Sequence, residues 1–528
     1  MTFHRISTLL AAALVCCAPA HATDFVTTIT IAPEHTIGAV SPMIYGQYLE
    51  HVQAEEETIY PSLWDDASPF ANATGVRTDV TSHVKSLGTP IVRWPGGCFA
   101  DNYHWEDGIG PQAGRVPKPN HHWGGMESNR FGTDEFLHWC NLTGTQPYIN
   151  VNLGSGTLEE ARRWLEYANG AVTTTQGQRR AENGYPQPRG VKYWGIGNET
   201  WGEWETGHTD ATTYGTSLSL WARALKADDP TIKVLGVGSE EGNDTAWDLE
   251  VLARAGADID YLTVHMYGLN TIYDGSEYEA VVYTPVYLEN RLKRMLEVVD
   301  SSPVVQKRTT PLHLSIDEWN IRHFYDGKQN RKSPRTLQDA LFTAGFFHAM
   351  IRCSPRVSMA NHVFLVNGNA ALLVNDSDVV WTPMAETFAQ YTRWMQGEAL
   401  QVAMETNATM TPPLPLTAAP GRRPAADYRS PADIPVADAA ACLDANGDLV
   451  VSVINRSSTA PMTLNFHLPE GYLASETWQL HHENVYASND FAQPRRVQPV
   501  RRAVSAQQSE WKVPSHSITL WKCRKQTP

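Results

Sequence analysis

Two carboxylates carry the clearest chemical signal in this sequence. Glu199 closes the segment YWGIGNE and Glu318 closes the segment LSIDE, and in each case a largely apolar run ends within three residues of the carboxylate. Hydrolysis of a glycosidic bond needs such a pair, because one carboxyl group protonates the leaving oxygen while the other attacks the sugar or activates water. Either residue alone would more often be a solvated surface carboxylate. The pair is informative if the fold brings both side chains to one place.

The surrounding elements predict such a fold. Short apolar runs alternate with amphipathic helical patterns, which favours parallel strands joined by helices. The spacing is typical of a (β/α)8 TIM barrel over residues 41–397, whose functional side chains lie at the carboxyl ends of the strands. An open doubly wound sheet is the alternative, but GQYLEHVQAEEE after the first run is not a glycine-rich phosphate loop. The predicted strands are Met43–Leu49, Pro90–Trp94, Pro147–Val151, Lys192–Gly197, Ile232–Val237, Tyr261–His265, Leu312–Asp317 and Ser358–Val363.

Glu199 follows the fourth predicted strand and Glu318 the seventh, so closure of the barrel would place them across its mouth from each other. The 17 tryptophans fit a carbohydrate ligand, since an indole ring can stack on the apolar face of a sugar. Trp123 is interpreted either as such a contact or as plain loop packing. Glu203 and Glu205, in the loop after Glu199, are expected to be solvated. The rings expected near the strand ends are Trp94, Trp105, Trp123, Trp194, Trp201, Trp204 and Trp319.

The ends of the chain have a different pattern. Residues 23–40 alternate like a strand, and residues 398–528 read as a C-terminal β-sandwich, jelly-roll-like, that this N-terminal strand would complete. Asn446-Gly447 between two apolar runs predicts a hairpin in that domain. A Pro-rich insertion occupies about 411–435.

The N-terminus and the composition exclude several classes. MTFHR, an apolar run and the small-residue pattern AHA predict a signal peptide over residues 1–22, and therefore a periplasmic or secreted protein. No later run is long enough for a membrane span. The net charge of -15 argues against nucleic acid as a partner. No metal is expected, because there is no HExxH or CxxC motif and the adjacent pair His121-His122 lacks ligand spacing.

Several motifs resemble one known family. RWPGGCFADNYHWEDGIGP at 93–111, YWGIGNETWG at 193–202 and LSIDEWN at 314–320 are similar to the α-L-arabinofuranosidases of glycoside hydrolase family 51. IYGQYLEHV at 44–52 and HWGG at 122–125 fit the same pattern, in the same order along the mature chain. The resemblance implies a TIM barrel with a C-terminal β-sandwich. It also implies a retaining mechanism with a covalent glycosyl-enzyme intermediate and no metal or organic cofactor.

The resemblance also implies roles for individual residues. Glu199 would be the general acid/base and Glu318 the nucleophile, with their carboxyl groups about 5–5.5 Å apart. Asn198 would bind a furanose hydroxyl, Tyr267 would lie beside the nucleophile, and Cys98 would face the sugar. The predicted substrate-binding set is Glu50, Cys98, Asn198, His265, Tyr267 and Trp123.

The expected function is exo-acting hydrolysis of terminal α-L-arabinofuranosyl residues from arabinoxylan, arabinan or derived oligosaccharides. An endo-β-1,4-glucanase or β-xylosidase on the same scaffold is the first alternative, and a non-catalytic carbohydrate-binding protein is the second. One departure affects the substrate: Phe364 stands where many members have a glutamine that contacts the sugar, so that contact is either missing or replaced by Asn361 or Asn367. Homo-oligomers occur in this family, but the sequence does not fix a number.

Overall fold

The computed structural model describes residues 25–52, 57–269, 271–274, 277–325, 328–329, 333–418, 433–504 and 509–526. The predicted signal peptide lies outside these ranges, as does most of the predicted Pro-rich insertion. In the described part of the chain, no helix is both long and apolar enough to cross a membrane.

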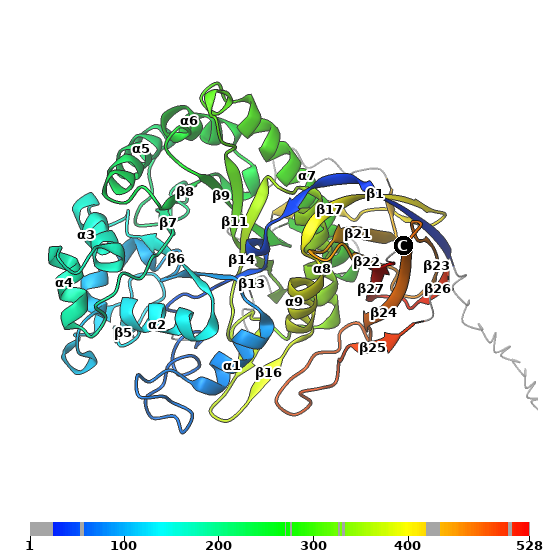
Figure 1. Ribbon diagram of the computed structural model, residues 1–528, viewed down its shortest axis with the longest axis horizontal. Helices are drawn as coiled ribbons and strands as arrows, with labels where there is room; N and C mark the ends of the chain where they lie inside the picture. The colour runs from blue at the N-terminus through cyan, green and yellow to red at the C-terminus, as the bar shows by residue number, and fades with distance from the viewer. Residues whose placement is uncertain are drawn as a thin grey trace, which may run out of the picture.

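A closed barrel of parallel strands forms the larger part of the fold (Figure 1). Its strands follow one another around the barrel in chain order, and β14 closes the ring on β2, where Asn361 lies opposite Gly46. Each predicted strand overlaps one barrel strand, so the predicted TIM barrel is confirmed. The barrel strands are β2 (Gly46–Tyr48), β3 (Ile91–Trp94), β6 (Gln146–Val151), β7 (Tyr193–Ile196), β8 (Lys233–Val237), β9 (Tyr261–Gly268), β11 (His313–Ile321) and β14 (Val357–His362).

Local signals in the sequence set the ends of the helices around the barrel. Thr157 caps α3 by accepting a hydrogen bond from the Glu160 amide, and Thr382 caps α9 ahead of a proline in its first turn. α1 and α2 end at Gly88 and Gly144, both in the left-handed conformation that glycine adopts most easily. The helices are α1 (Thr78–Leu87), α2 (Thr133–Thr143), α3 (Leu158–Asn169), α4 (Thr175–Glu182), α5 (Ala211–Asp228), α6 (Thr245–Ala255), α7 (Glu277–Ser301), α8 (Leu337–Arg352) and α9 (Pro383–Trp394).

A nine-stranded sheet forms the second domain, in the order β25-β24-β27-β22-β21-β17-β1-β23-β26. β1 lies inside this sheet, antiparallel to β17 and parallel to β23, so the N-terminal strand completes the C-terminal domain as predicted. The predicted turn at Asn446-Gly447 joins β21 to β22. The strands are β1 (Phe25–Val40), β17 (Gly397–Thr406), β21 (Ala437–Leu443), β22 (Leu449–Asn455), β23 (Met462–His467), β24 (Tyr472–Leu480), β25 (Val500–Ala503), β26 (Glu510–Val513) and β27 (Ser517–Lys525).

This sheet curls over a single apolar core. Ala474 of β24 and Val513 of β26, which lie near opposite ends of the strand order, belong to the same buried cluster as Ile29 of β1. Strands from both ends therefore face each other across the core, which is the predicted sandwich arrangement.

A buried charged cluster connects the two domains. Arg352 at the end of α8 binds Glu289 of α7 at 2.6 Å and Asp438 of β21 at 2.9 Å, and Arg456 binds Asp438 at 2.7 Å. Burial alone would raise the pKa of Asp438, but the two guanidinium groups hold it well below its usual range. The carboxylate therefore stays charged and joins the barrel helices to the sheet, which lie side by side in Figure 1.

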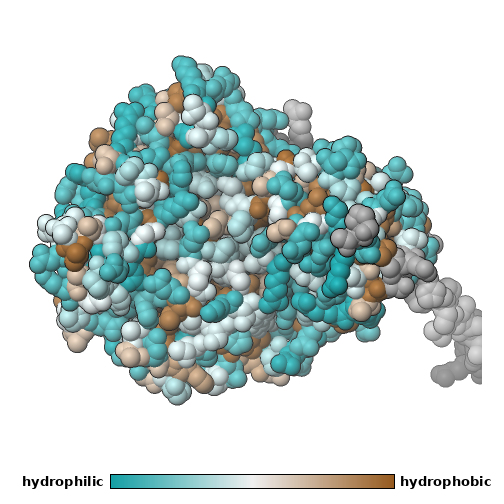
Figure 2. Space-filling view, in the orientation of Figure 1, coloured by the Kyte–Doolittle hydropathy of each residue, from teal (hydrophilic) through white to brown (hydrophobic). Residues whose placement is uncertain are grey.

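The molecular surface seen from the same side is mostly hydrophilic, and its hydrophobic residues occur in small groups, as is usual for surfaces that face water (Figure 2).

Candidate active site

A pocket at the carboxyl ends of the barrel strands brings together most of the predicted site residues. Its volume of about 210 Å³ is below the roughly 300–1,000 Å³ of pockets that hold drug-sized ligands, which favours a single sugar ring over a longer stretch of chain. The lining residues are Glu50, Cys98, His122, Trp123, Glu199, Trp204, Tyr267, Glu318, Asn320, Arg322, Val363, Phe364 and Asn369.

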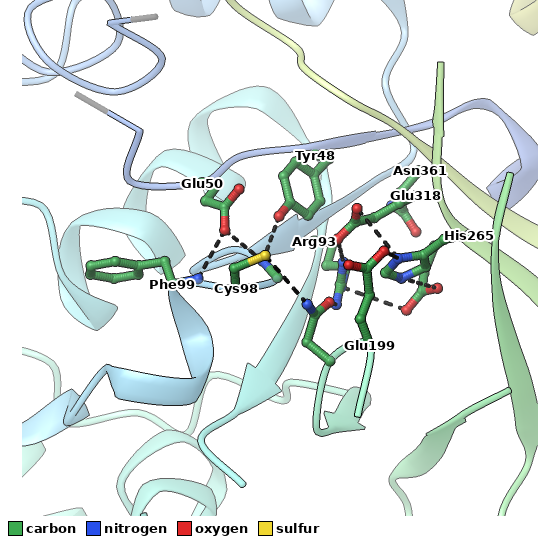
Figure 3. A network of polar contacts seen from close by, with 12 residues as sticks. Tyr48, Glu50, Arg93, Cys98, Phe99, Glu199, His265, Glu318 and Asn361 are labelled. Atoms are coloured by element: carbon green, nitrogen blue, oxygen red, sulfur yellow. Dashed lines mark hydrogen bonds and ion pairs between the residues drawn. The ribbon is translucent and has the colours of Figure 1, made fainter. Parts of the chain in front are cut away.

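Glu318 lies in the middle of a strand and accepts hydrogen bonds on both carboxylate oxygens. Tyr267 donates its hydroxyl to Oε2 at 2.7 Å. Arg93 donates a guanidinium N–H to Oε1 at 2.7 Å (Figure 3). The pairing of β11 with β9 shifts register between Ser315 and Glu318. Such an irregularity re-aims side chains, which explains how the successive residues Asp317 and Glu318 both contact Arg93.

Glu199 lies just beyond the end of β7, in a backbone conformation that non-glycine residues seldom adopt. Its φ is 38°, and Gly197 two residues earlier has a φ of 83°. One carboxylate oxygen lies 2.8 Å from Nδ1 of His265, and the other accepts a hydrogen bond from the Trp204 indole N–H at 2.9 Å. The turn thus directs the Glu199 side chain toward Glu318 and His265, as Figure 3 shows.

The two carboxyl groups are close neighbours. An oxygen of Glu199, an oxygen of Glu318 and a ring nitrogen of His265 all lie within 4.8 Å of one another. In retaining glycosidases the carboxyl groups are only about 5–5.5 Å apart, whereas inverting enzymes need about 6.5–9.5 Å to admit a water molecule. The arrangement therefore has the spacing that the retaining chemistry requires.

Positive groups compensate the buried carboxylates. Burial opposes a charge on His265, but the nearby carboxylates of Glu318, Asp317 and Glu199 raise its pKa well above the usual value, so the imidazole is protonated at neutral pH. Asp317 is also buried, yet Arg93 and His265 keep its pKa below the usual value. His265 thus supplies a positive charge beside Glu318 and Asp317, and its Nδ1 also contacts Glu199.

The PGG motif lets the loop after β3 approach the site closely. A Cβ on Gly97 would lie 2.4 Å from Oε1 of Glu318 and 2.7 Å from Oδ1 of Asn198, and a Cβ on Gly96 would lie 2.4 Å from Glu50. The absence of side chains allows the amide of Gly97 to donate to Glu50 at 3.0 Å. Burial, and then the charge of Glu318, raise the pKa of Glu50.

Asn198, Cys98 and Glu205 form a second group beside the carboxylates. The amide of Asn198 accepts from Arg93 at 2.9 Å and donates to Oε1 of Glu205 at 3.1 Å, and the thiol of Cys98 donates to the same oxygen at 2.7 Å. The prediction that Glu205 is solvated is wrong: its side chain is only 5% exposed. Burial and the neighbouring Glu199 raise the pKa of Glu205 to about 9.

The aromatic residues divide into core and pocket groups. Trp94, Trp105, Trp194 and Trp319 are fully buried and serve packing, so the expectation that they surround a sugar is wrong for these four. Trp123 and Trp204 line the pocket, and Trp204 is 44% exposed.

The two asparagines expected to replace the family glutamine do not line the pocket. Phe364 lines the pocket, but Asn361 is buried and donates to the Gln47 carbonyl, and Asn367 binds Ser62. Neither asparagine is among the lining residues, which instead include Asn320, Asn369 and Arg322. The sequence reasoning missed these three, as well as the pairing of Arg93 with Glu318. An arginine near the end of a predicted strand, two residues before a PGG motif, was the available signal for Arg93.

The family models that match this chain and the relatives named below are all described as α-L-arabinofuranosidases. Two family models match it: the α-L-arabinofuranosidase 1 domain over residues 83–281 and the α-L-arabinofuranosidase C-terminal domain over residues 317–517. A probable α-L-arabinofuranosidase C from Aspergillus clavatus is 30% identical over 527 residues, covering 94% of this chain and 97% of that protein. An intracellular exo-α-(1→5)-L-arabinofuranosidase from Streptomyces lividans is 29% identical over 490 residues, covering 89% and 70%. The structure of the thermostable GH51 α-L-arabinofuranosidase from Thermotoga petrophila superposes with a TM-score of 0.82 at 30% identity, covering 94% and 100%.

Proposed function

The chain belongs to the α-L-arabinofuranosidases of glycoside hydrolase family 51, and we propose that it removes single α-L-arabinofuranosyl residues from the non-reducing ends of arabinoxylan, arabinan or their oligosaccharides. The small pocket supports exo action, since it suits one terminal ring. An endo-β-1,4-glucanase would need an open cleft along several sugars, and neither this alternative nor the β-xylosidase is favoured by the relatives.

Glu318 acts as the nucleophile in this proposal. Its carboxylate attacks the anomeric carbon of the arabinofuranosyl ring while the glycosidic C–O bond breaks, giving a covalent arabinosyl ester on Glu318. Tyr267 and Arg93 support the role, because they hold the carboxylate with one donor on each oxygen. The same contacts orient it toward the pocket, where the sugar would bind.

Glu199 acts as the acid and then as the base. It gives its proton to the leaving oxygen in the first step, and in the second step it takes a proton from the water that attacks the anomeric carbon and releases Glu318. The single observation that carries this proposal is the separation of Glu199 and Glu318, within 4.8 Å between oxygens. Glu50 and Cys98 line the pocket, and Asn198 contacts Cys98. All three are proposed to contact the sugar hydroxyls, with Trp123 on the wall.

Activity on 4-nitrophenyl α-L-arabinofuranoside, measured beside the β-xyloside and the β-glucoside, tests the substrate class. We expect the arabinofuranoside to be hydrolysed fastest, whereas a preference for either pyranoside would refute the proposal. Glu318→Ala should lose at least about 10⁴-fold in kcat, because no covalent intermediate can form. If the wild-type protein binds arabinan but does not hydrolyse it, the result would indicate the carbohydrate-binding alternative.

A Glu199 variant tests the acid role in the first step and the base role in the second step separately. Glu199→Ala should lose roughly 10²–10⁴-fold on a substrate with a poor leaving group, since general acid catalysis contributes about that much. On an activated aryl arabinofuranoside the first step needs less acid help, so the intermediate should accumulate, and added azide should restore turnover. Full activity of Glu199→Ala on an unactivated oligosaccharide would contradict the assignment.

We also propose export through the leader at residues 1–22. The charged start, the apolar run and AHA before Thr23 support it. N-terminal sequencing of the protein recovered from cell fractions should give Thr23 as the first residue outside the cytoplasm. A full-length cytoplasmic product would refute this.

A further inference from the structure

Three side chains with different ligand atoms converge on one wall of the pocket. Cys98 follows β3, His122 lies in the turn between the short strands at Lys118–Pro119 and Met126–Glu127, and Glu205 follows β7. The Cys98 sulfur, a His122 ring nitrogen and a Glu205 carboxylate oxygen all lie within 4.8 Å of one another. No spacing in the sequence announces this group, because its members come from three separate loops.

The surroundings of this cluster favour a cation. Cys98 and His122 line the pocket and are accessible from it, while Glu205 lies behind them and is 5% exposed. The second carboxylate oxygen of Glu205, Oε2, is buried and has no hydrogen-bond partner in the described part of the chain. Glu50 and Glu199 line the same small pocket, so further carboxyl oxygens lie close to the cluster.

We propose that Cys98, His122 and Glu205 form a Zn²⁺ site with an open fourth position facing the pocket. Zinc takes a thiolate, an imidazole and a carboxylate as ligands, and three protein ligands leave a place for water. Cys98 and Glu205 would therefore release their protons to solvent when the ion binds. Zinc bonds of about 2.0–2.3 Å put tetrahedral ligand atoms roughly 3.3–3.8 Å apart. Cys98 Sγ and Glu205 Oε1, now 2.7 Å apart, would separate slightly, and half-buried His122 would move inward.

Zinc at this position inhibits the enzyme. Glu205 and Cys98 both contact the side chain of Asn198, so metal binding withdraws two of its partners. The ion and its water also occupy the wall of a pocket of only about 210 Å³. Inhibition by Zn²⁺ should therefore compete with the arabinofuranoside and be reversed by EDTA.

Variants of the two adjacent histidines test the site. His122→Ala should raise the Zn²⁺ concentration for half-inhibition by at least about tenfold, because even residues that only orient a metal ligand contribute roughly 10–100-fold to affinity. His121→Ala is the matched control: this neighbour is exposed and outside the cluster, so the variant should be inhibited like wild type. Each variant is compared with its own zinc-free rate, and a melting curve verifies that it is folded.

A second readout needs no substrate and so separates this proposal from the proposed function. Of the cysteines in the described ranges, Cys140, Cys353, Cys442 and Cys523 are buried, so a maleimide should label Cys98 first in the native protein. Zn²⁺ should slow labelling of Cys98 in wild type and in His121→Ala, and should have at least tenfold less effect in His122→Ala.

Two outcomes would overturn the proposal. Unchanged Cys98 labelling at zinc concentrations that inhibit would place the ion elsewhere. Glu199, His265 and Glu318 are another group with suitable ligands in the described ranges, and zinc bound there would inhibit His122→Ala and wild type equally. An absence of both inhibition and protection up to millimolar Zn²⁺ would show that the cluster does not bind zinc.

Discussion

The unexpected burial of Glu205 gives a sharp prediction about stability. In Glu205→Gln the side chain keeps its shape and its Oε1 acceptor, so Cys98 and Asn198 retain the hydrogen bonds that they donate at 2.7 and 3.1 Å. The variant removes only the ability to ionise. The substitution should therefore stabilise the fold wherever wild-type Glu205 is held protonated against its tendency to lose the proton.

The magnitude follows from the two states of the chain. Burial, followed by the charge of Glu199, raises the folded-state pKa of Glu205 from 4.5 to about 9. Between those values the folded protein binds a proton that the unfolded chain has released, so the unfolding free energy falls by about 1.4 kcal/mol for each pH unit gained. From about pH 5 to about pH 8 the wild type loses up to about 4 kcal/mol that Glu205→Gln does not lose.

Thermal melts of both proteins in EDTA at about pH 5, 6.5 and 8 measure this difference. The two melting temperatures should nearly coincide at the lowest pH and separate as the pH rises. At the highest pH, Glu205→Gln should melt several degrees above wild type. Glu203→Gln is the matched control, because Glu203 lies two residues earlier and is exposed; its melting temperature should follow wild type. A Glu205→Gln protein that is less stable than wild type at about pH 8 would refute the reasoning, since it would show that the site requires a carboxylate.

Three further substitutions test the contacts of the two carboxylates. Tyr267→Phe removes the hydroxyl that donates to Glu318 at 2.7 Å, and should lower kcat/KM by roughly 10–100-fold, because a hydrogen bond to a charged group contributes about 1.5–3 kcal/mol; steady-state assays measure it. Trp204→Phe keeps a ring but loses the N–H that binds Glu199, and should lower kcat most on substrates with poor leaving groups; equal losses on aryl and natural substrates would contradict this. His265→Gln removes the cation beside Glu199 and Glu318 and should destabilise the fold by roughly 3–5 kcal/mol, measured by urea unfolding; an unchanged midpoint would contradict it.

Barrel strands and the two carboxylates could be predicted because each has a local signal. An apolar run bounded by helical patterns marks each strand, and Glu199 and Glu318 come just after the fourth and the seventh of these runs. Once the strands are counted, closure of the barrel fixes which ends meet. The short β2 is the exception in detail: the predicted strand began at Met43, but Pro42–Tyr45 form a turn of 3-10 helix, so only Gly46–Tyr48 pair.

The environment of the loop residues could not be read from the sequence, because contacts between distant segments determine it. Glu205 lies in a polar loop, but Cys98, more than a hundred positions earlier, covers it and supplies a hydrogen bond. Similarly, Asn361 has the strand-end position of a sugar contact, yet the register between β14 and β2 points its amide at the carbonyl of Gln47. A single sequence does not show which distant segments come into contact in the folded chain.

The two carboxylates are held in different ways, and this explains why the loop after Glu199 belongs to the site. Glu318 lies within β11, whose pairing to the neighbouring strands fixes its backbone. Glu199 lies outside β7 with a φ of 38°, and a residue in the left-handed region costs about 1–3 kcal/mol that its surroundings must offset. The contacts with His265 and Trp204 supply that compensation, and Trp204 is part of the loop TWGEWE. The position of the proposed acid therefore depends on residues that follow it in sequence, so changes in this loop should alter the chemistry at Glu199 before they alter the fold.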